Sequence, residues 1–254
     1  MKEDPLRHDQ KKPHMKVAKI KQFAIIAAGE GSRLQQEGIE TPKPLVLVNG
    51  ETLIDRLIRI FINQGAEKII IAINSIYSEV EQHLKRIAQQ TSNCKIEWVV
   101  ANTPSSMHSF YELSHLIDDA PFCLTTVDTI FTEQDFAKYL NIFEQSEHDG
   151  VMAVTDFIDD EKPLYVEVTK EHKILNFHDT SSNCHFISGG IYGLKSNAIK
   201  TLKHCIETKQ FRMRNFQRAL IADGLYLQAY PFSKILDVDH AEDINKAESF
   251  LQQT

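Results

Sequence analysis

The sequence predicts an α/β protein with a doubly wound, mostly parallel sheet and a smaller antiparallel portion. Three observations support this prediction. Continuous apolar runs, typical of strands buried on both faces, recur along the first 155 residues. Segments with helical spacing separate these runs, which is the alternation of a parallel sheet with helices on both faces. After residue 160 the rhythm changes to closely spaced strands.

The strands are expected in two groups. The apolar runs of the parallel part lie at 23–28, 68–73, 95–100, 122–127 and 150–154. The later part is expected to hold a strand pair and two further strands, at 164–168, 173–177, 186–194 and 225–230.

Helices are expected between and after these strands, at 52–64, from 78, at 108–117, from 132, at 196–208, at 214–222 and at 241–252. Polar residues at three of the starts have the spacing of N-terminal caps. Ser78 is followed three residues later by Glu81, and Thr132 by Asp135. Asp239 is suited to cap the last helix, with Glu242 completing the box.

Composition and charge exclude several classes of protein. The 254 residues are 42% hydrophobic and 25% charged, as in a folded protein rather than a disordered or fibrous one. No apolar run approaches the roughly 18 residues of a membrane-spanning helix, so membrane insertion is not expected. The net charge of −7 argues against a general nucleic-acid binder, and it leaves room for a local basic pocket that binds a small anion.

Cysteine and histidine usage favours a cytoplasmic protein. The four cysteines show no Cys-x-x-Cys spacing, which favours reduced thiols over a disulfide scaffold or a zinc site. The eleven histidines form no pattern of metal ligands.

The chain divides into a basic N-terminal extension, residues 1–20, and a single domain, residues 21–254. Residues 1–21 hold seven Lys or Arg and three acidic residues, and no apolar segment typical of a secretory signal. A basic arm that touches a partner and a solvated tail, with Met15 as an alternative start, both fit this composition.

The strongest chemical signal directly follows the first expected strand. A glycine-bearing loop there, Gly29-Glu30-Gly31-Ser32, lets backbone N–H groups approach a phosphate closely. The loop lacks the third glycine of a dinucleotide fingerprint and the Gly-Lys-Ser/Thr of a P-loop. Arg33 closes it with a planar fork of donors, and Lys43 follows between two prolines as a positioned charge. This order of residues indicates a polyphosphate site.

The motifs Gly-Glu-Gly-Ser-Arg-Leu at 29–34 and Pro-Lys-Pro-Leu at 42–45 resemble the signature of the sugar-phosphate nucleotidyltransferase family. The resemblance extends over roughly residues 21–252 in strand order. It implies a Rossmann-like nucleotidyltransferase fold and the condensation of a nucleoside triphosphate with a sugar 1-phosphate, which gives an NDP-sugar and pyrophosphate. It also implies that Arg33 and Lys43 are catalytic, and that the triphosphate is cradled by Ala28, Gly29, Gly31 and Ser32.

Three aspartates are the expected magnesium ligands. Asp128 ends a buried strand, so its carboxylate is expected in the ligand crevice at the carboxyl edge of the sheet. Asp237 and Asp239 lie on alternate residues and would share one face of a strand. Mg²⁺ takes few protein carboxylates alongside phosphate oxygens, and the family resemblance implies such an ion here. Asp237 is the favoured ligand because Asp239 also suits the cap of the last helix, but the alternation itself leaves both open.

Two further segments are expected to select the substrates. Asn102, Ser105 and Ser106 offer hydrogen bonds to the base or ribose, and they are also typical of a helix start. This stretch resembles the cytidylyltransferase branch of the family, which makes CDP-alcohols. Gly189 and Gly190 resemble the strand whose glycine lets the sugar approach, and they also fit a tight strand crossing. Lys162 is the remaining candidate for the acceptor phosphate, because Glu161-Lys162-Pro163 resembles a Glu-Lys-Pro sequence of the family, although it precedes the strand pair.

The sequence therefore predicts a Mg²⁺-dependent nucleotidyltransferase whose partners are a nucleoside triphosphate and a sugar or alcohol phosphate. Two alternatives stay open. One is a CTP-dependent enzyme for phosphocholine or another small alcohol phosphate. The other is a catalytically silent subunit that senses nucleotide or sugar on the same fold. The oligomeric state, including a homo-oligomer, is also open.

Overall fold

Four parallel strands form the first part of the central sheet. The computed structural model describes residues 19–159, 161–181 and 183–253. In spatial order these strands are β5 (Lys95–Val100), β4 (Lys68–Ile73), β1 (Gln22–Ala27) and β6 (Phe122–Thr126). Residues 23–27 of β1 are all buried because helices cover both faces of the sheet.

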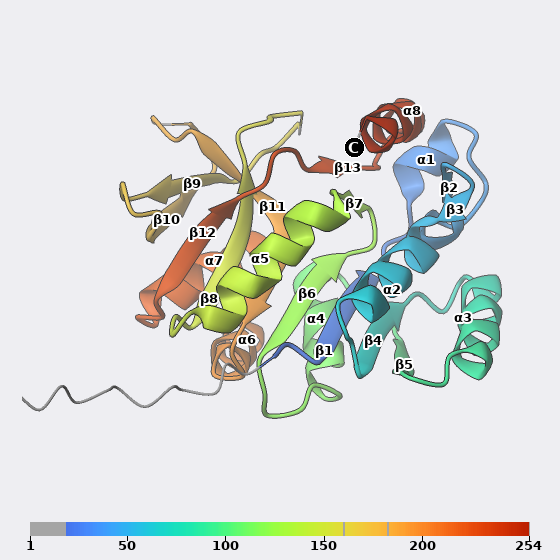
Figure 1. Cartoon of the computed structure of the whole chain (residues 1–254), viewed down its shortest axis with the longest axis horizontal. Helices are drawn as coiled ribbons and strands as arrows, with labels where there is room; N and C mark the ends of the chain where they lie inside the picture. The colour runs from blue at the N-terminus through green and yellow to red at the C-terminus, as the bar shows by residue number, and fades with distance from the viewer. Residues whose placement is uncertain (1–18, 160, 182, 254) are drawn as a thin grey trace, which may run out of the picture.

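Antiparallel pairing extends the sheet beyond β6 (Figure 1). The next strand, β11 (Phe186–Leu194), runs antiparallel to β6 and is followed by β8 (Gly150–Thr155) and β12 (Leu227–Pro231). The first residues of β11 also pair with the hairpin of β9 (Tyr165–Val168) and β10 (Ile174–His178). The parallel sheet with a smaller antiparallel part that the sequence predicts is confirmed.

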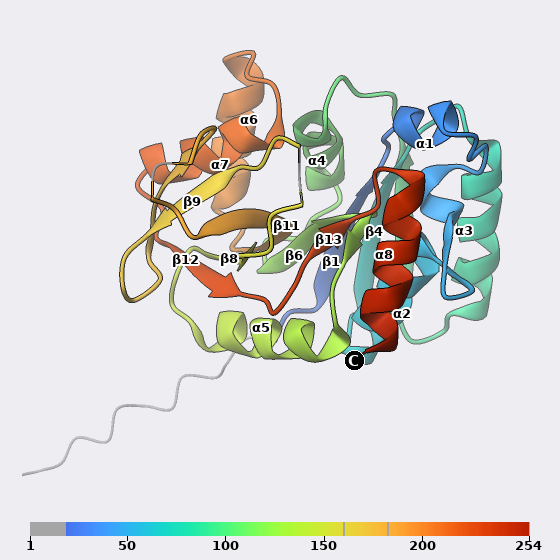
Figure 2. The same cartoon turned by 90° about the horizontal axis from the view of Figure 1, so that it is seen from above.

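Helices pack on both faces of the sheet and give two hydrophobic cores (Figure 2). One face carries α2 (Leu53–Asn63), α3 (Ser78–Gln90), α5 (Glu133–Gln145) and α8 (Ala241–Gln252). The other carries α4 (Ser106–Ser114), α6 (Ala198–Glu207) and α7 (Met213–Ala222). The apolar runs and helical spacings of the sequence account for both cores.

Short elements gather at the carboxyl edge of the parallel strands. They are α1 (Ser32–Gln36), the 3-10 turn η1 (Lys43–Leu45), β2 (Leu47–Val48), β3 (Glu51–Thr52), β7 (Thr129–Ile130) and β13 (Leu236–Asp237). The pairing of β7 with β13 matters most, because it brings the end of the chain beside Asp128. The amide of Val238 donates to the carbonyl oxygen of Asp128 at 3.1 Å.

The helix starts match the sequence in one case and differ in two. Thr132 caps α5, and its hydroxyl accepts from the amide of Asp135 at 3.0 Å. The capping box predicted at Ser78 is wrong, because α3 has its N-cap at Tyr77 and Ser78 lies inside the helix. The cap predicted at Asp239 is also wrong.

His240 caps α8 in place of Asp239, and Asp243 rather than Glu242 completes the capping box. The physical reason is competition for the carboxylate. Asp239 accepts hydrogen bonds from two cations on other elements, so its oxygens point away from the helix start.

The predicted basic extension at 1–20 lies almost wholly outside the described residues. Within the described part of the chain, no helix combines the length and the apolar character that crossing a membrane requires. All four cysteines are free thiols.

Candidate functional site

The glycine loop turns at the end of β1 and closes onto Lys43. Gly31 has a φ of +66°, in the left-handed region that glycine adopts most readily. A Cβ atom at this position would lie 3.2 Å from the Cβ of Lys43. Both facts require glycine at position 31, whereas a Cβ at Gly29 would meet open space. The loop is therefore held against Lys43 on one side and open on the other.

The loop borders a cleft of about 600 Å³ at the carboxyl ends of the parallel strands. This is the position where open α/β sheets bind ligands. The structure brings most of the predicted nucleotide and phosphate residues together here: Ala28, Gly29, Gly31, Ser32, Arg33, Lys43, Asn102, Ser105, Ser106 and Asp128. We refer to this cavity as the nucleotide cleft.

The polar groups of the 102–106 segment are partly engaged by the protein. The side-chain oxygen of Asn102 accepts from the backbone and hydroxyl of Ser75, at 3.2 and 2.9 Å. Its amide nitrogen has no partner in the described part of the chain. Asn102 therefore offers the cleft a hydrogen-bond donor. Ser105 shares its hydroxyl with His108 at 2.9 Å and precedes α4 as its N-cap residue.

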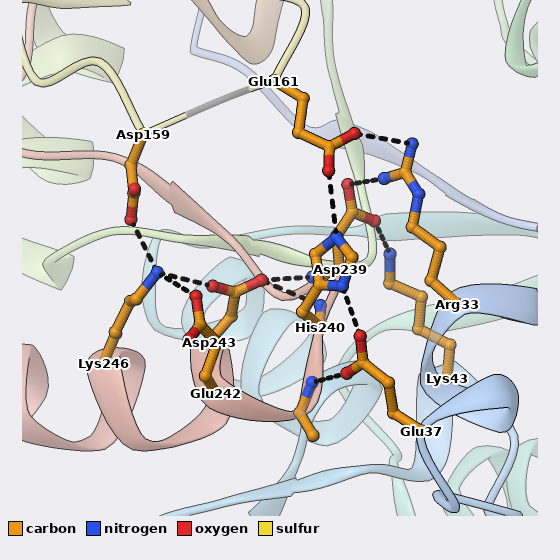
Figure 3. A network of polar contacts seen from close by, with 11 residues as sticks. Arg33, Glu37, Lys43, Asp159, Glu161, Asp239, His240, Glu242, Asp243 and Lys246 are labelled. Carbon is orange, nitrogen blue, oxygen red and sulfur yellow. Dashed lines mark hydrogen bonds and ion pairs between the residues drawn. The ribbon is translucent and has the colours of Figure 1, made fainter.

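Lys43 pairs with two aspartates, and Figure 3 shows its contact with Asp239, which Arg33 also contacts. Its ammonium donates to Asp128 at 2.5 Å and to Asp239 at 2.7 Å, and the residue is only 9% exposed. Arg33 donates to the other oxygen of Asp239 at 2.7 Å. The glycine loop, the end of β6 and the segment after β13 thus meet in one chain of ion pairs.

These contacts fix the charges. Burial alone lowers the pKa of Lys43, but Asp128 and Asp239 outweigh it and raise that pKa above its ordinary value. For Asp128 the effects are reversed. Burial alone raises its pKa, but the ammonium of Lys43 and the hydroxyl of Thr126 outweigh burial and hold the pKa below its ordinary value. Lys43 is therefore held as an ammonium and Asp128 as a carboxylate near neutral pH.

A second cavity of about 490 Å³ adjoins the first and shares two of its lining residues, Arg33 and Asp239. Gly189 and Asp237 line only this second cavity, which we call the acceptor cleft. A methyl group built on Gly189 would overlap Cδ1 of Ile235 and lie 3.3 Å from the carbonyl oxygen of Ala153. The absence of a side chain at Gly189 therefore allows close packing within the protein.

Two predicted acceptor residues do not reach the acceptor cleft. Gly190, with a φ of +72°, lies instead against Thr129, whose hydroxyl would be 3.2 Å from a Cβ atom there. The register of β11 against β8 shifts at this point, so the positive φ of Gly190 belongs to a local irregularity of the strand. Lys162 is exposed and lines neither cleft, and its carbonyl oxygen accepts from Arg214.

Further ion pairs surround the acceptor cleft (Figure 3). His240 bonds Glu37 at 2.6 Å, and this hydrogen bond raises the pKa of the imidazole. Lys246 contacts Asp159 at 3.1 Å and Asp243 at 3.2 Å. These pairs tie α8 to α1 and to the segment after β8.

Sequence reasoning missed two residues of the site. Asn74 is 6% exposed, lines the nucleotide cleft and donates to the carbonyl oxygen of Ala28 at 3.0 Å. It follows β4 directly, and that place at the carboxyl end of a buried strand was the available signal. Thr126 bonds Thr129 at 2.7 Å and supports Asp128, but its side chain belongs to an apolar strand pattern that hides it.

The carboxylates suit a hard cation that keeps other ligands. Across the described ranges, no group of three or more His, Cys, Asp and Glu side chains is arranged to hold a metal ion. Asp128 and Asp239 share the ammonium of Lys43, and Asp237 stands opposite Thr129 in the β7–β13 pair. Two carboxylates with substrate phosphates are a usual set for Mg²⁺, so the donors fit this ion.

The sheet is Rossmann-like, and its carboxyl edge carries a glycine loop, two cations and aspartates. These features are typical of proteins that bind nucleotides and phosphates. The family model described as Nucleotidyl transferase matches residues 23–254. The chain belongs to this family.

The similar proteins share parts of the chain. A probable UDP-N-acetylglucosamine pyrophosphorylase of Acanthamoeba polyphaga mimivirus is 36% identical over 82 residues, 32% of this chain and 30% of the relative. The bifunctional protein GlmU of Methanococcus maripaludis strain C5 is 23% identical over 194 residues, 73% of this chain and 43% of the relative. The chain thus spans less than half the length of these two relatives.

A solved structure shows the same fold over nearly its whole length. The inositol-1-phosphate CTP transferase from T. maritima superimposes with a TM-score of 0.77 and 15% identity. The match covers 93% of this chain and 98% of the other.

Proposed function

We propose that the protein is a nucleotidyltransferase that condenses a nucleoside triphosphate with a sugar 1-phosphate and releases pyrophosphate. The observation that carries this proposal is the chain of ion pairs from Arg33 through Asp239 and Lys43 to Asp128. It lies where the two clefts adjoin, so a group bound in one cleft reaches a group bound in the other. We also infer that residues 21–254 form one catalytic domain and that the enzyme acts in the cytoplasm.

Without substrate, the two cations of the site are neutralised by its two aspartates. Each cation now contacts a carboxylate, and a triphosphate is a stronger partner for Arg33 and Lys43 because it carries several anionic oxygens. Binding would turn these two side chains toward phosphate and free Asp128 and Asp239. Mg²⁺ held by Asp128 with Asp239 or Asp237 would neutralise the phosphates and orient them.

The proposed reaction needs no general base. An oxygen of the acceptor phosphate is already anionic, and it attacks the α-phosphorus in line. The new bond joins that oxygen to the α-phosphorus, and the bond from the α-phosphorus to the bridging oxygen breaks. Pyrophosphate leaves with the electron pair, next to Arg33. Lys43 offsets the charge that builds on the reacting phosphate, and the loop around Gly31 fixes its position.

The first test is nucleotide binding. Thermal unfolding would be followed with ATP, GTP, CTP and UTP, each with and without Mg²⁺. A ligand at 100 times its Kd adds about 2.7 kcal/mol, which shifts the melting temperature by roughly 5–11 °C in a chain of this size. We expect a Mg²⁺-dependent shift with one or two triphosphates. No shift with any of them would refute the nucleotide site.

The second test is turnover. Pyrophosphate release would be measured with the preferred triphosphate and glucose, N-acetylglucosamine or mannose 1-phosphate, and the product identified by mass spectrometry. Asp128→Asn should lower kcat at least 100-fold, because it removes one charged oxygen ligand of the metal. Asp179→Asn, a carboxylate outside both clefts, is the control. Full activity of Asp128→Asn would remove the metal assignment, and binding without turnover of any acceptor would indicate a sensing protein.

One observation favours a second candidate, a transferase for a cationic alcohol phosphate such as phosphocholine. The ionisable side chains that line the acceptor cleft are mostly acidic: Glu37, Asp159, Glu161, Asp237, Asp239, Glu242 and Asp243 against Arg33, Lys246 and His240. An excess of carboxylates attracts an ammonium group and repels an additional carboxylate. Turnover of phosphocholine with CTP in the same assay, and none of the sugar phosphates, would establish this candidate.

A further inference from the structure

A third cavity, of about 660 Å³, lies apart from the proposed active site. It is bounded by α2, the first turn of α5 and the segment after β12, and it shares no lining residue with the nucleotide or the acceptor cleft. Its lining includes Arg56, Arg59 and Lys138. The state of these cations indicates what the cavity binds.

Arg56 is a buried cation without a carboxylate partner. It is 4% exposed, donates to the carbonyl oxygen of Phe131 and lies with its guanidinium carbon 5.2 Å from the centre of that ring. Within the described part of the chain it makes no ion pair. Burial, helped by the nearby charge of Arg59, lowers the pKa of Arg56 to about 10. Fully buried arginines are rarely left unpaired, so this one indicates a missing anion.

The carboxylates that line the same cavity are already engaged. Glu51 accepts from Arg59 at 2.8 and 2.9 Å, and Glu133 accepts from the same guanidinium. Asp135 accepts from the backbone of Ser233 at 3.1 Å and from its hydroxyl. Glu51 and Glu133 act on the charge of Arg56 and offset part of the lowering of its pKa, but among the described residues none of the three carboxylates forms an ion pair with it.

Three more donors at the cavity have no partner among the described residues. Lys138 is exposed and makes no hydrogen bond or ion pair with any described residue. The amides of Glu133 and Gln134 begin the 13-residue helix α5, ahead of its first internal hydrogen bond, and they too have no partner in the described ranges. The positive end of this helix thus meets a buried guanidinium and a free ammonium at one cavity.

We propose that this cavity is a binding site for a small phosphate-bearing anion, either inorganic phosphate or a phosphate ester. A planar guanidinium, an ammonium and two helix N-terminal amides are the donors that bind tetrahedral oxyanions in proteins. The anion would supply the charge that Arg56 lacks, and the volume leaves space for an organic group on the phosphate. This site stands independently of the transferase reaction, because it shares no residue with either cleft.

The test is an NMR titration of the full chain, labelled with ¹⁵N, with inorganic phosphate and with glycerol 3-phosphate. We expect the amide signals of Glu133 and Gln134 to shift with both probes. The mutation Lys138→Glu should weaken binding at these amides at least tenfold. Lys138 is exposed, so this variant is expected to fold. Lys200→Glu makes the same charge change on an exposed residue of α6 and should leave the Kd unchanged. Arg56→Gln, where it folds, should abolish the shifts.

The variant Arg33→Ala distinguishes binding of phosphate at the proposed active site from binding at α5. Shifts at Glu133 and Gln134 that survive Arg33→Ala support the proposal. Shifts confined to residues 29–33, or equal loss in the Lys138 and Lys200 variants, would overturn it, as would no shift at α5. Tighter binding of glycerol 3-phosphate than of phosphate would assign the site to an ester, and the reverse order to free phosphate.

Discussion

Gly189 should be required because Ile235 fills the space where its side chain would be. The structure places Cδ1 of Ile235 so close that a methyl group on Gly189 overlaps it, with the carbonyl oxygen of Ala153 at 3.3 Å behind. Gly189 is not among the residues with positive φ, so alanine brings crowding without backbone strain. The perturbation Gly189→Ala therefore isolates a packing effect beside the acceptor cleft.

The magnitude follows from which atom must move. Forcing a methyl group into a packed site costs about 1–3 kcal/mol, or roughly 2–12 °C in melting temperature for a chain of this size. Ile235→Val removes the Cδ1 atom itself, at a cost of about 0.5–1.5 kcal/mol. In that background Gly189→Ala should cost less than about 0.5 kcal/mol, which gives a coupling of about 0.5 kcal/mol or more.

The assay is urea unfolding of the wild type, both single variants and the double variant. Ile235 lines the acceptor cleft, so Gly189→Ala should also raise the KM for the acceptor while leaving the KM for the triphosphate unchanged. Additive effects of the two substitutions would refute the reasoning. That result would mean that the crowding comes from the fixed backbone of Ala153, and that Ile235 moves away without resistance.

Three further predictions concern charge and helix starts. Lys43→Met should lower kcat about 10²–10³-fold in the pyrophosphate assay, since it removes a preorganised charge, and a cooperative urea transition would show that the variant is folded. Two arginines of α7 hold the pKa of Asp179 below its ordinary value, so its contribution to stability is present at neutral pH and is lost as pH falls through the lowered pKa. The urea midpoint of Asp179→Asn should therefore fall less on acidification than that of Glu79→Gln, an exposed carboxylate, and equal falls would contradict this. Thr52 caps α2 by accepting from the third amide of the helix at 3.1 Å, so Thr52→Ala should cost about 1 kcal/mol, whereas Ser78→Ala should stay within about 0.5 kcal/mol. A large loss for Ser78→Ala would restore the capping role that the structure denies it.

Local patterns predicted the strands because a strand that is buried on both faces has a continuous apolar run in its sequence. The residues at 68–73, 95–100 and 186–194 form strands with the expected bounds. The same logic located Asp128, since a polar residue that ends a buried strand faces the ligand edge of a parallel sheet. Polar residues at the ends of buried strands can therefore be identified as site candidates from the sequence. The same rule applies to Asn74, which directly follows a buried strand.

Side-chain partners across the chain were not accessible in this way. Alternation does not single out Asp239 as the partner of Lys43, because it puts Asp237 and Asp239 on one side of an extended segment. The His240–Glu37 pair joins two surface positions with no periodic signal. Lys162 stands in a Glu-Lys-Pro sequence that resembles one of the family, and only the tertiary structure shows that it lines neither cleft.

The ion pairs of Asp239 reach back 196 residues to Lys43 and 206 to Arg33. During synthesis on the ribosome, the glycine loop and Asp128 leave the exit tunnel well before β13 and the residue after Val238. The site is thus completed only after these later residues have been synthesised. A polypeptide truncated before β13 would keep every strand of the central sheet and lack the carboxylate that joins the two clefts, so the sheet is complete before the proposed site is.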